Sequence, residues 1–141
     1  MTTEPPILKI VIPVLPPSVN KQHRPGLRTR RAGGKTFISP TIFKTDEAKL
    51  WVTNAALFMK PFKLVPQRYY VEVKIISNWY CKDGVTPLVK DCRNHGKLVV
   101  DAVFARYGVN DCWVWDDRVV KCHNTELEAV EVSLWRYDDK P

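Results

Sequence analysis

The chain has 141 residues and a formal net charge of +7; 45% of its residues are hydrophobic and five are tryptophan. This length and composition predict one folded domain, 1–141, with a sizeable core, and they exclude a disordered chain. No apolar run approaches the ~18–20 residues of a membrane helix, and the acidic, proline-interrupted start argues against a secretory leader. We therefore expect a cytoplasmic protein.

The first part of the chain predicts a strand followed by a long connection. Residues 7–14 alternate in hydrophobicity as a strand does, and a pair of prolines stops them. Residues 18–40 predict a connection that can include an irregular hairpin at Gly33 and Gly34. A connection of this length in a compact domain is usually functional or mobile, so it is the first segment to consider for a partner.

Two strongly patterned segments follow. Residues 41–59 carry apolar side chains at three- and four-residue steps, which predicts a helix that Pro61 ends. Residues 69–79 place β-branched side chains on one face and Glu72 and Lys74 on the other, which predicts a strand with one buried face.

The second half of the chain predicts a loop, a helix and two strands. A loop at 82–89 leads to a helix at 92–107, which ends at a glycine. A short strand at 119–122 and a longer one at 127–137 follow, and we expect the tail at 138–141 to be frayed.

This order of elements predicts an α+β fold, an α/β two-layer domain in which a mixed β-sheet of four to five strands packs against two helices. The chain contains no internal repeat and no linker that would divide it. The five tryptophans are more typical of a core or an interface than of base stacking, and we assign them no catalytic role.

The cysteines and histidines give no recognisable metal or nucleophile pattern. Cys81, Cys92, Cys112 and Cys122 lack the short spacing of a zinc site, and His123 beside the last of them does not complete a finger. Disulfides are not expected without a secretory leader, so we interpret the four cysteines as free thiols.

The positive charge is concentrated in one segment. Residues 20–35 hold six basic residues and no acid, whereas residues 101–141 hold nine acidic and five basic residues. Arginine side chains match the geometry of phosphate oxygens, so residues 20–40 predict a basic, mobile DNA-binding loop, although a merely solvated loop is the alternative. The candidate DNA-binding residues are Asn20, Lys21, Arg24, Arg28, Arg30, Arg31 and Lys35, with Asn94 in the second helix.

The stretch from 90 to 121 gathers carboxylates beside a lysine. Asp91, Asn94, Lys97 and Asp101 lie at the start and along one face of the predicted helix, and Asp116 and Asp117 precede the next strand. Hard cations such as Mg²⁺ take oxygen ligands and are usually held by one or two protein carboxylates. The alternatives are ordinary ones: Asp91 as a helix cap, a surface pair between the lysine and the acid four residues on, and an aspartate turn before a strand.

These residues carry a resemblance that spans nearly the whole chain. The segment LPPSVNKQHR at 15–24, the pattern D-x-x-N-x-x-K-x-x-x-D at 91–101 and the pair DD at 116–117 resemble, in order and spacing, the RusA-type Holliday junction resolvases of phages and prophages. The resemblance implies a homodimer that cuts four-way and branched DNA with Mg²⁺, or Mn²⁺ as a substitute, inside a bacterial cell.

Carried over by position, the resemblance implies roles for individual residues. Asp91 and Asp117 would be metal ligands and catalytic residues, and Lys97 would be catalytic or would contact phosphate. The commonest family pattern has a second aspartate two residues after the first, and Arg93 stands there in this chain. Asp101 or Asp116 could supply the missing oxygen, and the alternative is a catalytically impaired protein of the same family that binds junctions without cutting them.

Overall fold

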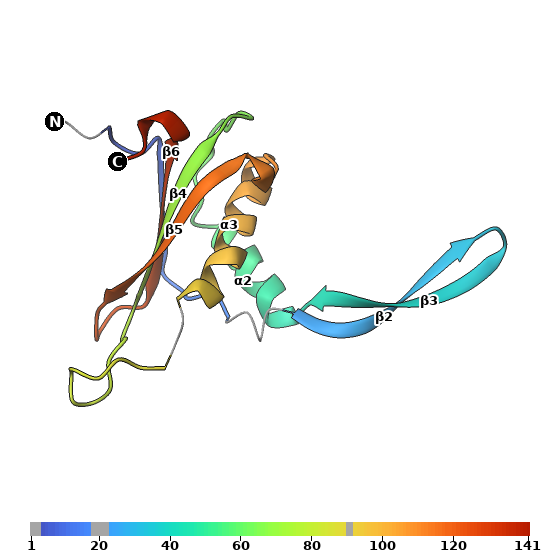
Figure 1. Cartoon of the computed structure of the whole chain (residues 1–141), viewed down its shortest axis with the longest axis horizontal. Helices are drawn as coiled ribbons and strands as arrows, with labels where there is room; N and C mark the ends of the chain where they lie inside the picture. The colour runs from blue at the N-terminus through green and yellow to red at the C-terminus, as the bar shows by residue number, and fades with distance from the viewer. Residues whose placement is uncertain (1–3, 18–22, 90–91) are drawn as a thin grey trace.

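The computed structural model describes residues 4–17, 23–89 and 92–141. Figure 1 shows a body of one sheet and two helices, from which a long hairpin projects. The sheet has the order β1-β6-β4-β5 and is formed by β1 (Leu8–Ile12), β4 (Tyr69–Ser77), β5 (Val114–His123) and β6 (Ala129–Arg136). Because β4 and β5 run parallel while the other neighbours run antiparallel, the predicted α+β class with a mixed sheet is confirmed.

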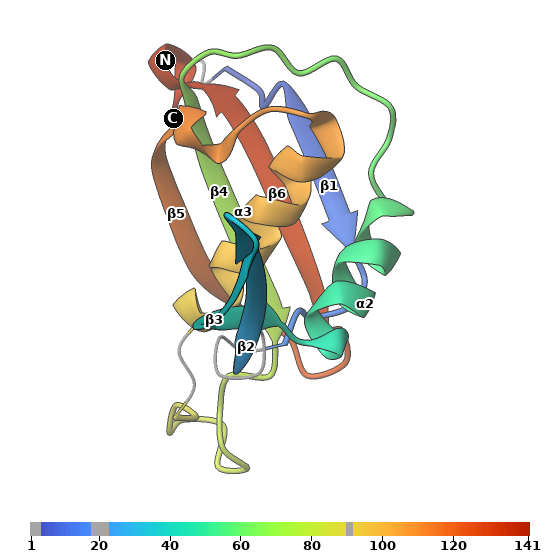
Figure 2. The same cartoon turned by 90° about the vertical axis from the view of Figure 1, so that its right-hand side faces the viewer.

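Two helices, α2 (Asp46–Ala56) and α3 (Arg93–Tyr107), lie across one face of this sheet, as Figure 2 shows. The core lies between the two layers, where Val71, Val73 and Ile75 of β4 are fully buried. Glu72 and Lys74 lie on the opposite face and are half-buried, so the two-faced strand predicted from alternation is confirmed. In the described part of the chain, no helix is long and apolar enough to cross a membrane.

The basic segment forms a hairpin where the sequence predicts mainly a connection. Strands β2 (His23–Ala32) and β3 (Lys35–Lys44) pair along their full length. They are joined by Gly33 and Gly34, whose φ angles of 59° and 76° are both positive, as a two-residue hairpin turn requires. The irregular hairpin expected at these glycines is therefore a regular ribbon of ten-residue strands, and the expectation of a loop is wrong for 23–40.

The first helix starts later than its periodicity predicts. Residues 41–44 belong to β3, where they pair with 23–26, so the predicted start at residue 41 is wrong. The helix begins after Thr45, whose hydroxyl oxygen accepts a hydrogen bond from the backbone N–H of Ala48 at 3.2 Å. This capping bond satisfies one of the N–H groups that the first helical turn leaves unpaired.

The second helix agrees with the sequence to within one residue. It begins after Cys92 and ends at Gly108, which adopts the left-handed conformation with φ 71° that commonly closes a helix. The apolar side of the predicted wheel is buried, namely Cys92, Val99, Val100 and Val103. Asp91, for which a helix cap is the alternative to a metal ligand, lies outside the described residues.

The last two strands and the tail differ from their predicted bounds. Strand β5 covers Val114–His123 rather than 119–122, because its early, polar half also pairs with β4. Strand β6 is slightly shorter than predicted, and the tail forms a short 3₁₀ helix, η2 (Tyr137–Asp139). The carboxylate of Asp138 pairs with Arg68 at 3.2 Å, and both side chains are exposed.

Three of the five tryptophans are core residues, as expected. Trp51, Trp79 and Trp135 are buried, and each indole N–H donates to a backbone carbonyl at 3.0 Å. Buried tryptophans are stable only when this N–H finds an acceptor. Trp113 is half-buried, and Trp115 is 59% exposed.

Candidate functional site

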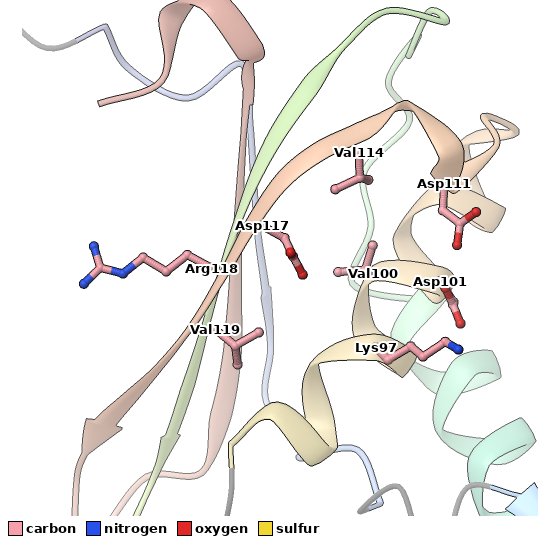
Figure 3. A pocket seen from close by; sticks show the side chains of 8 residues that line it. All are labelled: Lys97, Val100, Asp101, Asp111, Val114, Asp117, Arg118 and Val119. Carbon is pink, nitrogen blue, oxygen red and sulfur yellow. The ribbon is translucent and has the colours of Figure 1, made fainter.

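A pocket of about 780 Å³ lies between α3 and β5. It brings together Lys97, Asp101 and Asp117, three of the residues that the sequence analysis selects, from two different elements. Figure 3 shows the side chains that line it, which are Lys97, Val100, Asp101, Asp111, Val114, Asp117, Arg118 and Val119.

Helix α3 presents Lys97 and Asp101 because most of its other positions are buried. Leu98, Val99 and Ala102 pack into the core, which leaves little of the helix facing outward. Lys97 is exposed and Asp101 is half-buried, and residues four apart lie one above the other on a helix. The core packing of the helix therefore leaves these two positions on its outward side.

The distance between α3 and β5 is set by a glycine. Gly96 is buried against Val119, and a Cβ atom at Gly96 would lie only 2.6 Å from Cγ2 of that valine. Only a residue without a side chain allows the helix to approach the strand so closely. Since Lys97 follows the glycine and Asp117 lies two residues before the valine, this contact positions the two walls of the pocket.

Strand β5 brings Asp117 into the pocket by means of a bulge. Tyr69 of β4 pairs with Val114 of β5, whereas the next residue of β4 pairs with Asp116, so Trp115 is an extra residue in the ladder. A bulge of this kind shifts the alternation of side chains by one position. Val114 and Asp117 consequently share the side of the sheet that faces α3, although they are three residues apart.

The neighbouring carboxylate lies on the other face of the sheet. Asp116 pairs with Lys140 at 3.4 Å and is not among the residues that line the pocket. Burial, and after it the Glu72 carboxylate, raises the pKa of Tyr70 on that same face, with a smaller contribution from Asp116. The side chain of Arg118 also extends away from Asp117 in Figure 3. The structure thus separates the two adjacent aspartates that the sequence treats as equivalent candidates.

Sequence reasoning missed Asp111, which lines the same pocket. It begins a short 3₁₀ helix, η1 (Asp111–Trp113), which is capped by Asn110 through a bond from the backbone N–H of Cys112 at 2.8 Å. Asp111 also borders an adjoining hollow of about 430 Å³ together with Lys97 and Asp101. The Asn-Asp pair just after the helix-ending glycine could have indicated it, because the connection returns the chain to the start of β5.

The donor chemistry of the pocket suits a hard divalent cation. Asp101, Asp111 and Asp117 offer carboxylate oxygens, and Mg²⁺ usually binds one or two such groups while keeping several waters. In the ranges that the structure describes, no three His, Cys, Asp or Glu side chains are close enough to form a complete ligand set. Asp91, the first expected ligand, lies outside those ranges. The described carboxylates therefore form no closed metal cage, and a cation bound there would depend on water for most of its ligands.

The candidate DNA-binding residues of the hairpin lie away from the pocket. Figure 1 shows the β2–β3 hairpin extending outward from the start of α2. Arg28, Arg31 and Lys35 are exposed on it. Asn20 and Lys21 lie outside the described residues, and only the backbone is described for Arg24, Arg30 and Asn94.

No protein-family model matches this chain, and a search of curated proteins found no match. The resemblance to RusA-type resolvases therefore stays an expectation from the sequence.

Proposed function

We propose that this chain is a RusA-type endodeoxyribonuclease that hydrolyses phosphodiester bonds in Holliday junctions and other branched DNA, with Mg²⁺ or Mn²⁺, during recombination and repair. The observation that carries the proposal is that Lys97, Asp101, Asp111 and Asp117 line one pocket between α3 and β5. Metal-assisted phosphoryl chemistry uses carboxylates that can hold a cation and positive groups that offset charge on the phosphate. The proposed setting is the cytoplasm of a bacterial host, with the gene carried by a phage or prophage.

Asp117 and Asp101 are the proposed metal ligands within the described structure, with Asp91 completing the set and Asp111 available through water. A cation bound there supplies Lewis-acid polarisation of a phosphate oxygen and lowers the pKa of bound water. The half-buried Asp101 and the strand-held Asp117 are fixed by the packing of two rigid elements. Such rigidity supports catalysis because the ligands need no rearrangement when the substrate arrives.

Lys97 has the proposed role of an electrostatic stabiliser. Its ammonium group is exposed at the pocket, and it stands on the same helix face as Asp101. A lysine in this place attracts a phosphodiester and offsets the negative charge that grows on its oxygens during hydrolysis. Val100, Val114 and Val119 form apolar parts of the wall and limit the water that can reach those oxygens.

The projecting hairpin has the proposed role of holding DNA. Its exposed Arg28, Arg31 and Lys35 face no acid within the segment 20–35. Contacts to phosphates position DNA without reading its sequence. Selectivity for branched DNA then comes from a homodimer, because a two-fold protein matches the symmetry of a four-way junction.

The sharpest test compares the two adjacent aspartates. Asp117→Asn should abolish cleavage of a labelled four-way junction in Mg²⁺ while leaving binding nearly intact, and Asp91→Asn should do the same. Asp116→Asn is the matched control: it changes the same chemical group one residue away, but on the opposite face of the sheet. The proposal is supported if EDTA stops cleavage by the wild type and if, of the three variants, only Asp116→Asn still cleaves. Equal activity of both variants would contradict it.

A second candidate is a junction-binding protein without nuclease activity. It is favoured by Arg93, which stands where the related enzymes commonly have an acid, and by the incomplete ligand set among the described residues. This protein would bind four-way DNA in a salt-sensitive manner. It would not cut that DNA, whichever divalent cation is added. The same junction assay, repeated with Mn²⁺, separates the two candidates.

A further inference from the structure

A second pocket, of about 310 Å³, lies near the far end of β5. Its lining residues are Trp79, Tyr80, Pro87, Lys121 and His123. Strands β4 and β5 are parallel and finish at Ser77 and His123, so this pocket lies at the carboxyl ends of a parallel pair. That is the edge at which open sheets with parallel strands most often bind ligands.

The imidazole of His123 is oriented by the backbone. Its Nδ1 accepts a hydrogen bond from the backbone N–H of Trp79 at 3.1 Å. A ring nitrogen that accepts carries no proton, so Nε2 carries the hydrogen and is a donor. The ring of Tyr80 stands edge-on to this imidazole, with the two centroids 4.6 Å apart. The pocket therefore offers two aromatic rings and, from Nε2 of His123, one N–H donor.

Lys121 adds a positive charge to these rings. Its Nζ lies 4.9 Å from the centroid of the Trp79 ring, and the lysine itself is exposed. Among the described residues, no carboxylate forms an ion pair with it. An ammonium group held beside an aromatic wall in this way is suited to an anion that carries a planar ring.

We propose that this pocket binds one nucleotide of a DNA strand, with the base against Tyr80 and His123 and the phosphate on Lys121. The choice of DNA as the ligand rests on the proposed function. The existence of the pocket and the chemistry of its lining do not depend on that function. The chemistry required is that of an unpaired nucleotide, because a base in a duplex has no free face to place against the rings.

The position of the pocket relative to the carboxylates supports this assignment. Asp117, Val119, Lys121 and His123 alternate along β5 and share one side of the strand. At ~3.3 Å per residue, Lys121 lies about 13 Å along the strand from Asp117. The pocket therefore holds a nucleotide a few positions from the phosphate at the carboxylates.

The test measures binding without any divalent cation, so it does not depend on cleavage. Fluorescence anisotropy reports the affinity of labelled oligothymidylate for wild type, Lys121→Gln and Tyr80→Leu. Loss of base stacking should weaken binding by about five- to 150-fold in the tyrosine variant. Loss of one phosphate contact should reduce the slope of log affinity against log salt by about 0.7 in the lysine variant. Lys49→Gln, an exposed lysine on α2, is the control and should change neither the affinity nor the slope by as much.

A second measurement uses the wild-type protein and is therefore independent of how the variants fold. An oligothymidylate with one 5-iodouracil is irradiated with the protein, and the attached peptide is identified by mass spectrometry. Crosslinks on Tyr80 or His123 support the nucleotide pocket. Crosslinks confined to other segments, or variants that bind like the control, overturn it. Failure of junction cleavage alone contradicts the proposed nuclease and leaves this binding result standing.

Discussion

Gly96→Ala tests whether the close contact between α3 and β5 determines the geometry of the pocket. The new Cβ would lie 2.6 Å from Val119 Cγ2, whereas carbon atoms pack at ~3.5–4.0 Å, so the helix must recede by about 1 Å. The valine cannot easily rotate away, because β-branched side chains have few allowed rotamers. Overpacking of this kind costs about 1–3 kcal/mol, and the gain in helix propensity offsets about 1 kcal/mol of it.

We therefore expect Gly96→Ala to lower the free energy of unfolding by about 1 kcal/mol in urea titrations, with an unchanged m-value. The same displacement moves Lys97 and Asp101 away from Asp117. A misplacement of about 1 Å in a catalytic site can reduce the rate by ~10²-fold. Single-turnover junction cleavage at saturating protein measures this loss separately from DNA affinity.

The double variant Gly96→Ala/Val119→Ala supplies the control. Shortening the valine makes room for the new methyl group, so the two changes should be less costly together than the sum of the single changes. We expect a coupling of at least ~1 kcal/mol, in the range found for residues in contact. If the two effects add within ~0.3–0.5 kcal/mol, or if Gly96→Ala simply stabilises the protein, the contact does not hold the two walls at their distance.

Three further predictions concern the hairpin, the assembly and one loop. Replacing Arg28 and Arg31 by Ala should flatten the salt dependence of junction binding by up to about two phosphate contacts, each near 0.9 in slope, with little change in single-turnover cleavage; an unchanged slope would place the DNA elsewhere. Light scattering at micromolar concentration should give a dimer, and an active monomer would contradict it. The Thr86 hydroxyl, followed by backbone N–H groups, lowers the pKa of Asp83 below its usual 3.8. The turn that these bonds close should therefore be fully stable above pH 3.8 and should open as the pH falls through the lowered pKa of Asp83. In an NMR titration, the pKa of Asp83 should be higher in Thr86→Val than in the wild type.

The parts of the fold that were predictable are those in which one strong local pattern agrees with the tertiary structure. Strand β4 alternates because one of its faces is buried against α3, so its core residues could be read from the sequence. Helix α3 ends where Gly108 takes a positive φ angle that other residues avoid. In both places the local preference and the packing point to the same structure.

The parts that could not be predicted depend on pairing between distant segments. The first half of β5 is polar and resembles a turn, yet it is a strand because it pairs in parallel with β4. The same ladder contains the bulge at Trp115 and so determines that Asp117, and not Asp116, enters the pocket. Asp111 was missed because the Asn-Asp pair before β5 indicates a turn, whereas its place at the pocket depends on where the chain returns after α3.

The hairpin also has a consequence for the length of any DNA that the protein holds. Each of its strands has ten residues, so at ~3.3 Å per residue the ribbon spans about 33 Å. One turn of a DNA duplex is of similar length, ~34–36 Å for about ten base pairs. Because the ribbon projects outward from the body, its far arginines would contact a bound duplex about one turn away from the DNA nearest the body. Junction arms shorter than about ten base pairs should therefore lose the contribution of the hairpin, while longer arms gain nothing more from it.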